Sequence, residues 1–115
     1  MDSILTSTKK MLGIQENYTH FDPDIIMHIN TVFLTLTQLG VGPAEGFFIE
    51  DESDEWTDFI QDNVKLLAVK SYMYIKVRLL FDPPQSSTFI DVLNRQASEL
   101  EWRLNLEVDP GKEAN

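Results

Sequence analysis

Two histidines and an aspartate are the residues whose types and spacing come closest to a metal or acid–base site. Asp24 and His28 lie four positions apart, as two ligands on one helix face would, and His20 is close in sequence. No further histidine or carboxylate stands at a helical spacing that would close such a site. We therefore interpret these residues as a polar helix face, and we expect no catalytic residue, metal site or cofactor.

The acidic stretch from Asp51 to Asp62 is twelve residues long, the length of a calcium-binding loop. Such a loop needs a glycine at its sixth position and a bidentate glutamate at its twelfth. Trp56 and Asp62 occupy those two places. The stretch is better interpreted as a solvated acidic run that begins a helix.

Composition limits the function classes further. The chain has 115 residues, no cysteine, and 19 acidic against 9 basic residues, which gives a net charge of −10. No lysine or arginine occurs from Phe21 through Asn63. One domain without disulfides is expected, and its charge should repel phosphate backbones. We expect neither a secretory signal nor a membrane-spanning helix, which would make the protein soluble and intracellular.

Hydrophobic periodicity predicts most of the chain as helix. Apolar residues recur at three- and four-residue steps, and glycines and prolines separate the segments. In the second segment Asp22 suits the N-cap, Pro23 the first helical position and Gly40 the stop. The longest apolar segment is apolar around most of its circumference, which places it in the middle of a bundle. The principal predicted helices are 3–12, 23–39, 64–81 and 88–107.

Residues 40–53 interrupt this pattern with three glycines and a proline and are predicted to form an irregular loop. The glycines superficially match a phosphate-binding loop, but they follow a helix and lack an adjacent cation. Within the loop, "FFIE" is the only strand-like piece. Ser53 is placed to cap a two-turn helix that carries Trp56, Phe59 and Ile60 on one face.

The stretch "FDPPQSST" predicts a helical hairpin, because Asp82-Pro83-Pro84 must end one helix before another begins. Ser86, Ser87 and Thr88 can each cap the second helix, and Thr88 and Asp91 are spaced like a capping box. That helix carries an apolar seam that suits packing against residues 64–81. The fold class is therefore all-α: a bundle of four to five helices over residues 1–108 with a hairpin of 64–81 and 88–107, and a flexible tail at 109–115. The seam consists of Ile90, Leu93, Ala97, Leu100 and Leu104.

Most aromatic residues are expected in the core. Trp102 is the exception, because it lies two positions after the seam residue Leu100 and should face solvent or a partner. Leu106 and Val108 continue the apolar character towards the end of the chain. These residues indicate a surface that docks onto another protein.

Four stretches, in this order, carry a resemblance to a known family: "ILTSTKKMLGI", "YTHFDPDIIMHINTVFLTLTQLGVGP", "VKSYMYIKVRLLFDPP" and "ELEWRLN". Together they resemble the small head-to-tail connector proteins, also called head-completion or adaptor proteins, of long-tailed bacteriophages and prophages. The resemblance extends from about Ile4 to about Leu106. No single motif is specific to the family, whereas the ordered set is.

The resemblance implies a structural protein of the virion at the head–tail junction, made in the host cytoplasm. Copies would form a homo-oligomeric ring below the portal protein, extend the channel for passing DNA, and offer a platform to a stopper or tail-completion protein. No membrane or cofactor is implied. The portal-side candidates are Trp102, Arg103, Leu106 and Val108. The candidates for the channel or lower-ring face are Glu45, Phe47, Glu50, Asp51, Glu52, Asp54 and Glu55.

The same charge and helical content also suit an acidic decoy that mimics DNA and binds a host DNA-binding protein. Such a decoy would act as a monomer or dimer and would bind a basic partner with steep salt dependence. A connector would instead form a high-order ring. An enzyme is a distant third reading, and its turnover would depend on His28.

Overall fold

A computed structural model describes residues 2–108, and the side chains of residues 2–106. Within that range the chain forms five helices and no strand, so the all-α prediction is confirmed. The helices are α1 (Ile4–Met11), α2 (Asp22–Gln38), α3 (Trp56–Phe59), α4 (Asn63–Phe81) and α5 (Ser87–Val108). The predicted tail 109–115 lies outside the described residues, and the domain boundary at 108 stays a prediction.

None of the described helices is both long and apolar enough to cross a membrane.

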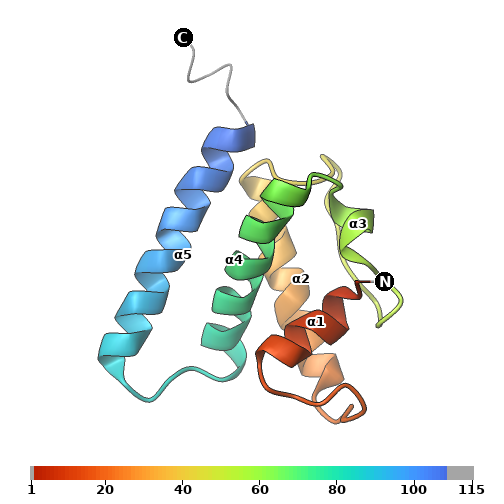
Figure 1. Ribbon diagram of the computed structural model, residues 1–115, viewed down its shortest axis with the longest axis vertical. Helices are drawn as coiled ribbons and strands as arrows, with labels where there is room; N and C mark the ends of the chain where they lie inside the picture. The colour runs from red at the N-terminus through yellow and green to blue at the C-terminus, as the bar shows by residue number, and fades with distance from the viewer. Residues whose placement is uncertain (1, 109–115) are drawn as a thin grey trace.

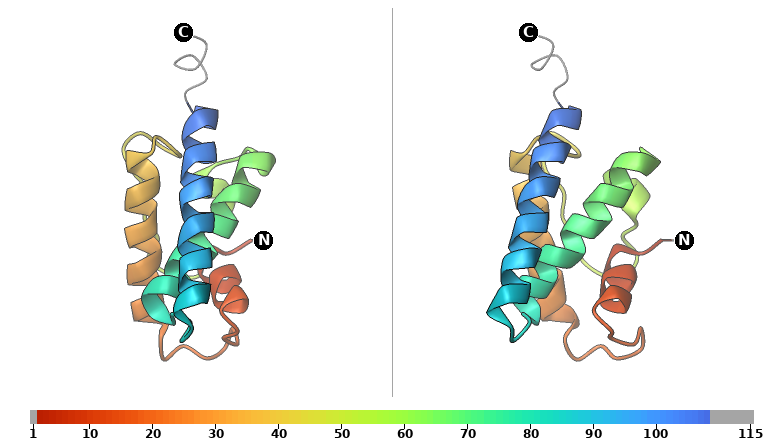
Figure 2. Two further views of the ribbon diagram at one scale, coloured as in Figure 1. Left: turned by 90° about the vertical axis from the view of Figure 1, so that its left-hand side faces the viewer. Right: turned by 60° about the vertical axis from the view of Figure 1, so that its left-hand side comes forward.

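Helix α4 lies in the middle of the molecule, as its apolar circumference predicts (Figure 1). Helix α5 runs along one side of α4, α2 packs behind it, and α1 crosses near its lower half (Figures 1 and 2). The core forms where α2 and α4 meet, around Phe33, Tyr72 and Met73, which are all at most 1% exposed. Burial of these large side chains is the main driving force for the bundle.

The turn after α2 confirms the prediction that Gly40 stops this helix. Gly40 has a φ of +85°, and the N–H of Val41 donates to the carbonyl of Leu36 at 2.9 Å. This pattern satisfies a carbonyl at the end of the helix that would otherwise lack a partner. Residues 40–53 then form the predicted irregular loop. The strand-like piece forms no strand, but the side-chain amide of Asn30 accepts from and donates to the backbone of Ile49 at 2.8 and 3.0 Å.

Three predicted helix caps are wrong, because the side chains concerned have other partners or positions. Asp22 is the first helical residue of α2 and not its N-cap, and its carboxylate lies beside Lys9. Ser53 donates its backbone N–H and hydroxyl to Asp51, and α3 has a single turn and not two. Thr88 lies inside α5, which begins at Ser87, and forms no capping box with Asp91. Of the three candidate caps it is Ser86 whose hydroxyl accepts the N–H of Phe89, so that alternative is confirmed.

The predicted hairpin is confirmed. The chain leaves α4 at Asp82 and the prolines carry it over to α5, whose predicted seam faces α4. Leu93, Ala97 and Leu104 of the seam are at most 5% exposed. A polar contact joins the two helices as well: the buried Tyr72 hydroxyl donates to Glu101 at 2.5 Å.

This contact predicts a loss of stability in alkaline solution. Burial, and next the hydrogen bond to the Glu101 carboxylate and its charge, raise the pKa of Tyr72 above its ordinary value of 10.0. Unfolded Tyr72 loses its proton near that value whereas folded Tyr72 keeps it, so stability falls as pH rises above it. Tyr72→Phe should cost about 1 kcal/mol at neutral pH and should flatten the decline above pH 10.0.

Urea unfolding at pH 7 and across the alkaline range measures both effects. Tyr18→Phe is the matched control, because Tyr18 is 49% exposed. This control should leave the stability and its pH dependence unchanged. An alkaline decline that is equally steep in Tyr72→Phe and in the parent protein would rule out Tyr72 as its source.

Candidate functional site

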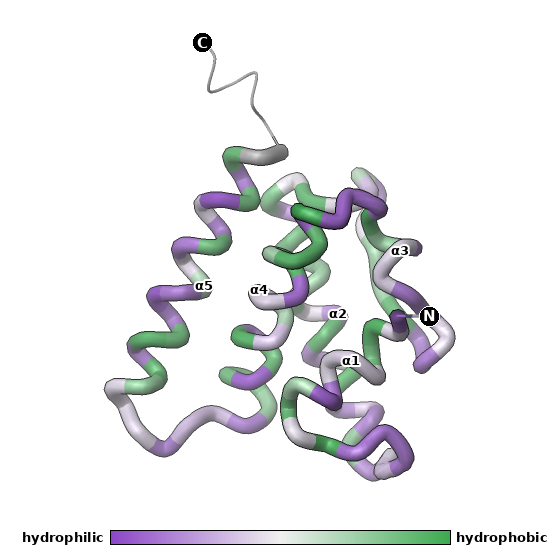
Figure 3. Tube along the Cα trace, in the orientation of Figure 1, coloured by the Kyte–Doolittle hydropathy of each residue, from purple (hydrophilic) through white to green (hydrophobic). Residues whose placement is uncertain are grey.

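The N-terminal end of α4 and the C-terminal end of α5 carry exposed apolar residues. Val64 and Leu67 on α4 and Trp102 on α5 are 79%, 68% and 63% exposed. Figure 3 shows that the first turns of α4 are mostly hydrophobic. Exposed apolar residues that gather in this way mark a surface for another protein. The exposure of Trp102 confirms that its side chain points away from the seam.

Val64 and Trp102 line a groove between the two helices, which we call the α4/α5 groove. Its upper part is a hollow of about 290 Å³. A second hollow of about 360 Å³ continues along the helices and shares Arg103 with the first. The upper part is lined by Asp62, Val64, Lys65, Ala68, Trp102, Arg103, Leu104 and Leu106. The lower part is lined by Ser71, Ile75, Gln96, Glu99, Leu100 and Arg103.

The polar residues of the groove lie at its rim. Arg103 is paired with Glu99 one turn earlier, with 2.9 Å between Nη2 and Oε1. Both side chains are about 60% exposed, so the pair contributes little to stability and Arg103 can exchange it for another carboxylate. The groove therefore combines an aromatic residue and aliphatic walls with an available guanidinium, which are the residue types that dominate protein interfaces.

The structure brings together three of the four predicted portal-side residues. Trp102, Arg103 and Leu106 all line the upper part of the groove. Val108 is the last residue of α5, and its side chain lies outside the described part. Val64 lines the same part of the groove, and Leu67 is exposed nearby on α4; sequence reasoning missed both. The apolar circumference of the segment 64–81 was the available signal, but it does not show which face of the helix stays uncovered.

The predicted channel-face residues do not form one uniform surface. Glu45, Glu50, Asp51 and Glu52 are exposed, and Ser53 holds the pKa of Asp51 below its ordinary value through hydrogen bonds. Asp54 is half-buried and accepts the N–H of Glu50 at 2.7 Å, and Glu55 precedes α3. Phe47 is directed inwards: its ring centroid lies 5.0 Å from Phe33 and 5.3 Å from Phe59.

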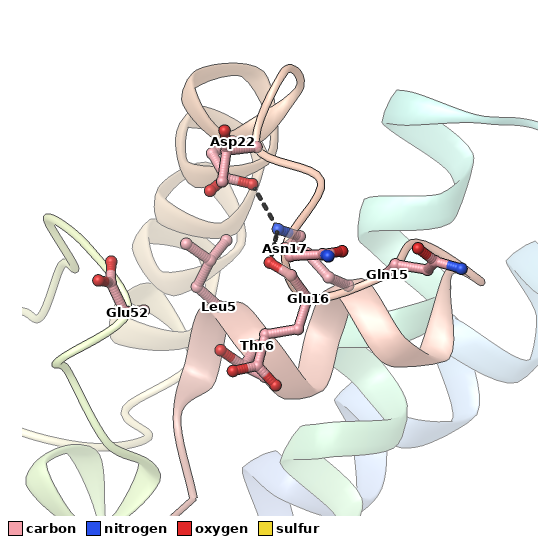
Figure 4. Close-up of a pocket in the computed structure, with 9 residues that line it drawn as sticks. Leu5, Thr6, Gln15, Glu16, Asn17, Asp22 and Glu52 are labelled. Atoms are coloured by element: carbon pink, nitrogen blue, oxygen red, sulfur yellow. Dashed lines mark hydrogen bonds and ion pairs between the residues drawn. The ribbon is translucent and has the colours of Figure 1, made fainter.

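A polar hollow of about 430 Å³ lies between α1, the loop after it and the start of α2 (Figure 4). Lys9 lies beneath it, 2% exposed, and its Nζ donates to the carbonyls of Glu16 and Tyr18 at 3.0 and 2.8 Å. Asp22 Oδ1 lies 2.9 Å from the same nitrogen. That oxygen is outside hydrogen-bonding geometry, so its contribution is mainly Coulombic. The arrangement fixes the loop 12–21 onto α1, and we interpret it as structural.

The two histidines pack against aromatic rings. His20 lies 4.9 Å from Phe21 and His28 lies 6.3 Å from Phe81, measured between ring centroids. Over the residues that the structure describes, no three histidine, aspartate or glutamate side chains gather as metal ligands would. The groove is therefore the strongest candidate site, and its chemistry is that of protein–protein contact.

An exposed apolar groove on an all-helical domain is a surface suited to contact with another protein. Comparison with family models identifies the particular family: residues 4–111 match the model described as phage connector protein, and the chain belongs to this family. The family supports a structural role as a phage connector, and with it a place in the virion. It is not known as a family of enzymes. Comparisons with curated proteins and with solved structures gave no significant match.

Proposed function

We propose that this protein is a head-to-tail connector that assembles as a ring below the portal protein, extends the DNA channel and offers a platform to a stopper or tail-completion protein. It is made in the host cytoplasm and functions at the head–tail junction. The observation that carries the proposal is the family match over residues 4–111. The α4/α5 groove supports it, because an assembly protein needs such a surface.

The portal-side contact is the upper part of the groove. Trp102 is 63% exposed there, and a tryptophan is among the residue types that contribute most when an interface covers them. Arg103 adds a guanidinium that can pair with a carboxylate of the portal. Leu106 and Val108 extend the contact to the end of α5.

The channel or lower-ring face is the exposed acidic part of the loop 40–53 and the residues after it. Ten carboxylates and no lysine or arginine occur from residue 21 to residue 63. A channel wall with this charge repels the phosphates of DNA, so DNA passes without adhering. Phe47 contributes to this face by anchoring the loop on Phe33 and Phe59.

Trp102→Ala should weaken binding to portal-bearing capsids by about 30-fold, because truncation of a covered tryptophan costs about 2 kcal/mol. The substitution should leave the fold intact, since the side chain is mostly exposed. Co-sedimentation of a concentration series with DNA-filled, tailless capsids of the parent phage measures the affinity.

Phe89→Ala is the matched control, because Phe89 is an exposed aromatic residue at the opposite end of α5. Capsid binding by this variant should equal that of the parent protein. If Trp102→Ala binds as well as Phe89→Ala does, the portal does not contact this end of α5.

A further inference from the structure

The two walls of the α4/α5 groove have the residue spacing of helices that pack along a further helix. On each wall the lining residues follow one another at steps of three or four positions. From α4 they are Val64, Ala68, Ser71 and Ile75, and from α5 they are Gln96, Leu100, Arg103 and Leu106. Stripes with this spacing are the surfaces through which helices pack on one another.

Small side chains in the middle of the α4 wall leave room for another backbone. Ala68 lines the upper hollow and Ser71 the lower one, and their short side chains let a further helix approach closely. Val64 and Trp102 at the upper end are 79% and 63% exposed, so no element of the described chain covers them. The groove therefore has the form of a vacant third position beside two packed helices.

The groove is about three helical turns long. Its α4 wall runs from Val64 to Ile75, a length of about 17 Å at a rise of about 1.5 Å per residue. The next position of the stripe is Arg78, whose Cζ lies 5.5 Å from the ring centroid of Phe89 on α5. This contact joins the two helices and closes the lower end of the groove. A helix of about three turns, the common length in globular proteins, fits the length that remains.

The charged groups that line the groove leave positive charge available to a partner. Asp62 accepts the backbone N–H groups of Val64 and Lys65 at 3.0 and 3.1 Å, so its carboxylate is engaged as the cap of α4. Glu99 is engaged by Arg103. No described carboxylate lies within ion-pair distance of Lys65. The ammonium of Lys65 on one wall and the exchangeable guanidinium of Arg103 on the other therefore favour an acidic partner.

We propose that the occupant of the α4/α5 groove is an amphipathic helix of the portal protein, with its apolar face on the groove and a carboxylate on each flank. Apolar residues at three- and four-residue steps pack between the walls, as in other complexes in which a helix fills a groove. One carboxylate pairs with Lys65, and the other takes Arg103 from Glu99. The inference rests on the proposed function for the identity of the partner, and it adds the kind of element that binds and its charge.

Zero-length crosslinking with a water-soluble carbodiimide tests the pairing, because this reagent joins an amine only to a carboxylate that touches it. The unaltered protein is bound to portal-bearing capsids and treated, and the linked peptides are identified by mass spectrometry. Lys65 should be joined to an aspartate or glutamate of the portal. Arg103→Lys keeps the charge and adds a second amine, which should be joined to a second carboxylate of the same portal helix. Lys10, exposed on α1, is the internal control and should give no link to the portal.

Charge reversal gives a second, independent measurement. Lys65→Glu combined with Arg103→Glu should weaken capsid binding by about tenfold or more, because repulsion replaces two attractive pairs. Lys10→Glu combined with Arg95→Glu changes the net charge equally at exposed positions outside the groove, and it should bind as the parent protein does.

Three outcomes would overturn the inference. Equal binding by the two double variants would show that the charges of the groove do not contact the portal. Links from Lys65 to another copy of this chain alone would assign the groove to a neighbour. A ring on capsids without links from Lys65 to the portal would show that the occupant is wrong and the connector function right, whereas portals that bind no protein would refute both.

Discussion

Gly42→Ala is expected to destabilise the fold by about 3 kcal/mol, the larger part of which comes from a steric clash. Gly42 has a φ of +88°, a region in which an L side chain costs about 1 kcal/mol. A Cβ at this position would also lie 2.3 Å from Cε1 and 2.7 Å from Cζ of Phe59. Phe59 is 3% exposed and packs on Phe33 and Phe47, so its ring cannot move without disturbing the core.

Thermal unfolding followed by circular dichroism measures this effect, and the midpoint should fall by more than about 10 °C. Gly13→Ala separates the clash from the backbone strain. Gly13 has a φ of +82°, and nothing lies within 4 Å of the point that an alanine Cβ would occupy, so only the strain of about 1 kcal/mol is expected there. Equal losses in the two variants would show that the contact between residue 42 and Phe59 is not tight.

Lys9→Met is expected to cost about 3 kcal/mol, although methionine fits the apolar stem of the lysine. The substitution removes the donor from the carbonyls of Glu16 and Tyr18 and the cation from Asp22. Buried polar groups without a partner carry the full cost of their desolvation. The loop 12–21 should also loosen, since Lys9 is its polar anchor on α1.

Lys10→Met is the control, because Lys10 is the next residue of the same helix and is exposed. Chemical denaturation should show a change within about 0.5 kcal/mol for this variant. Amide hydrogen exchange in residues 12–21 should accelerate in Lys9→Met alone. Similar stabilities and exchange rates in the two variants would mean that the buried ammonium does not hold the loop.

The helices could be predicted from the sequence because their apolar periods and their breakers agree. Gly40 ends α2, and Asp82 with the two prolines ends α4. The apolar seam of α5 packs against α4. Local propensity and tertiary packing favour the same structure in these segments. The fold class and the hairpin followed from that agreement.

The helix starts were harder to predict, because a capping side chain can choose among several partners. Asp22 has the right type for an N-cap, but the buried Lys9 attracts its carboxylate. Ser53 likewise bonds Asp51 and not the start of α3. Sequence alone offers no way to tell Lys9 from Lys10, since only the packing of the loop 12–21 decides which of the two is buried.

The candidate site was predicted in part. The position of Trp102 relative to the seam was enough to place it on the surface, and Arg103 and Leu106 lie with it. The contribution of α4 was not predictable, because an apolar helix in a bundle does not reveal which of its faces stays uncovered. Val64 and Leu67 became visible as surface residues only when the neighbours of α4 were known.

The central claim is that this phage connector family member assembles on the portal vertex. Electron microscopy of portal-bearing, DNA-filled, tailless capsids of the parent phage, mixed with the purified protein, tests it most directly. The account predicts a new ring of density directly below the portal. Portals that stay bare at saturating, folded protein would contradict the account and would favour an acidic decoy for a basic host protein.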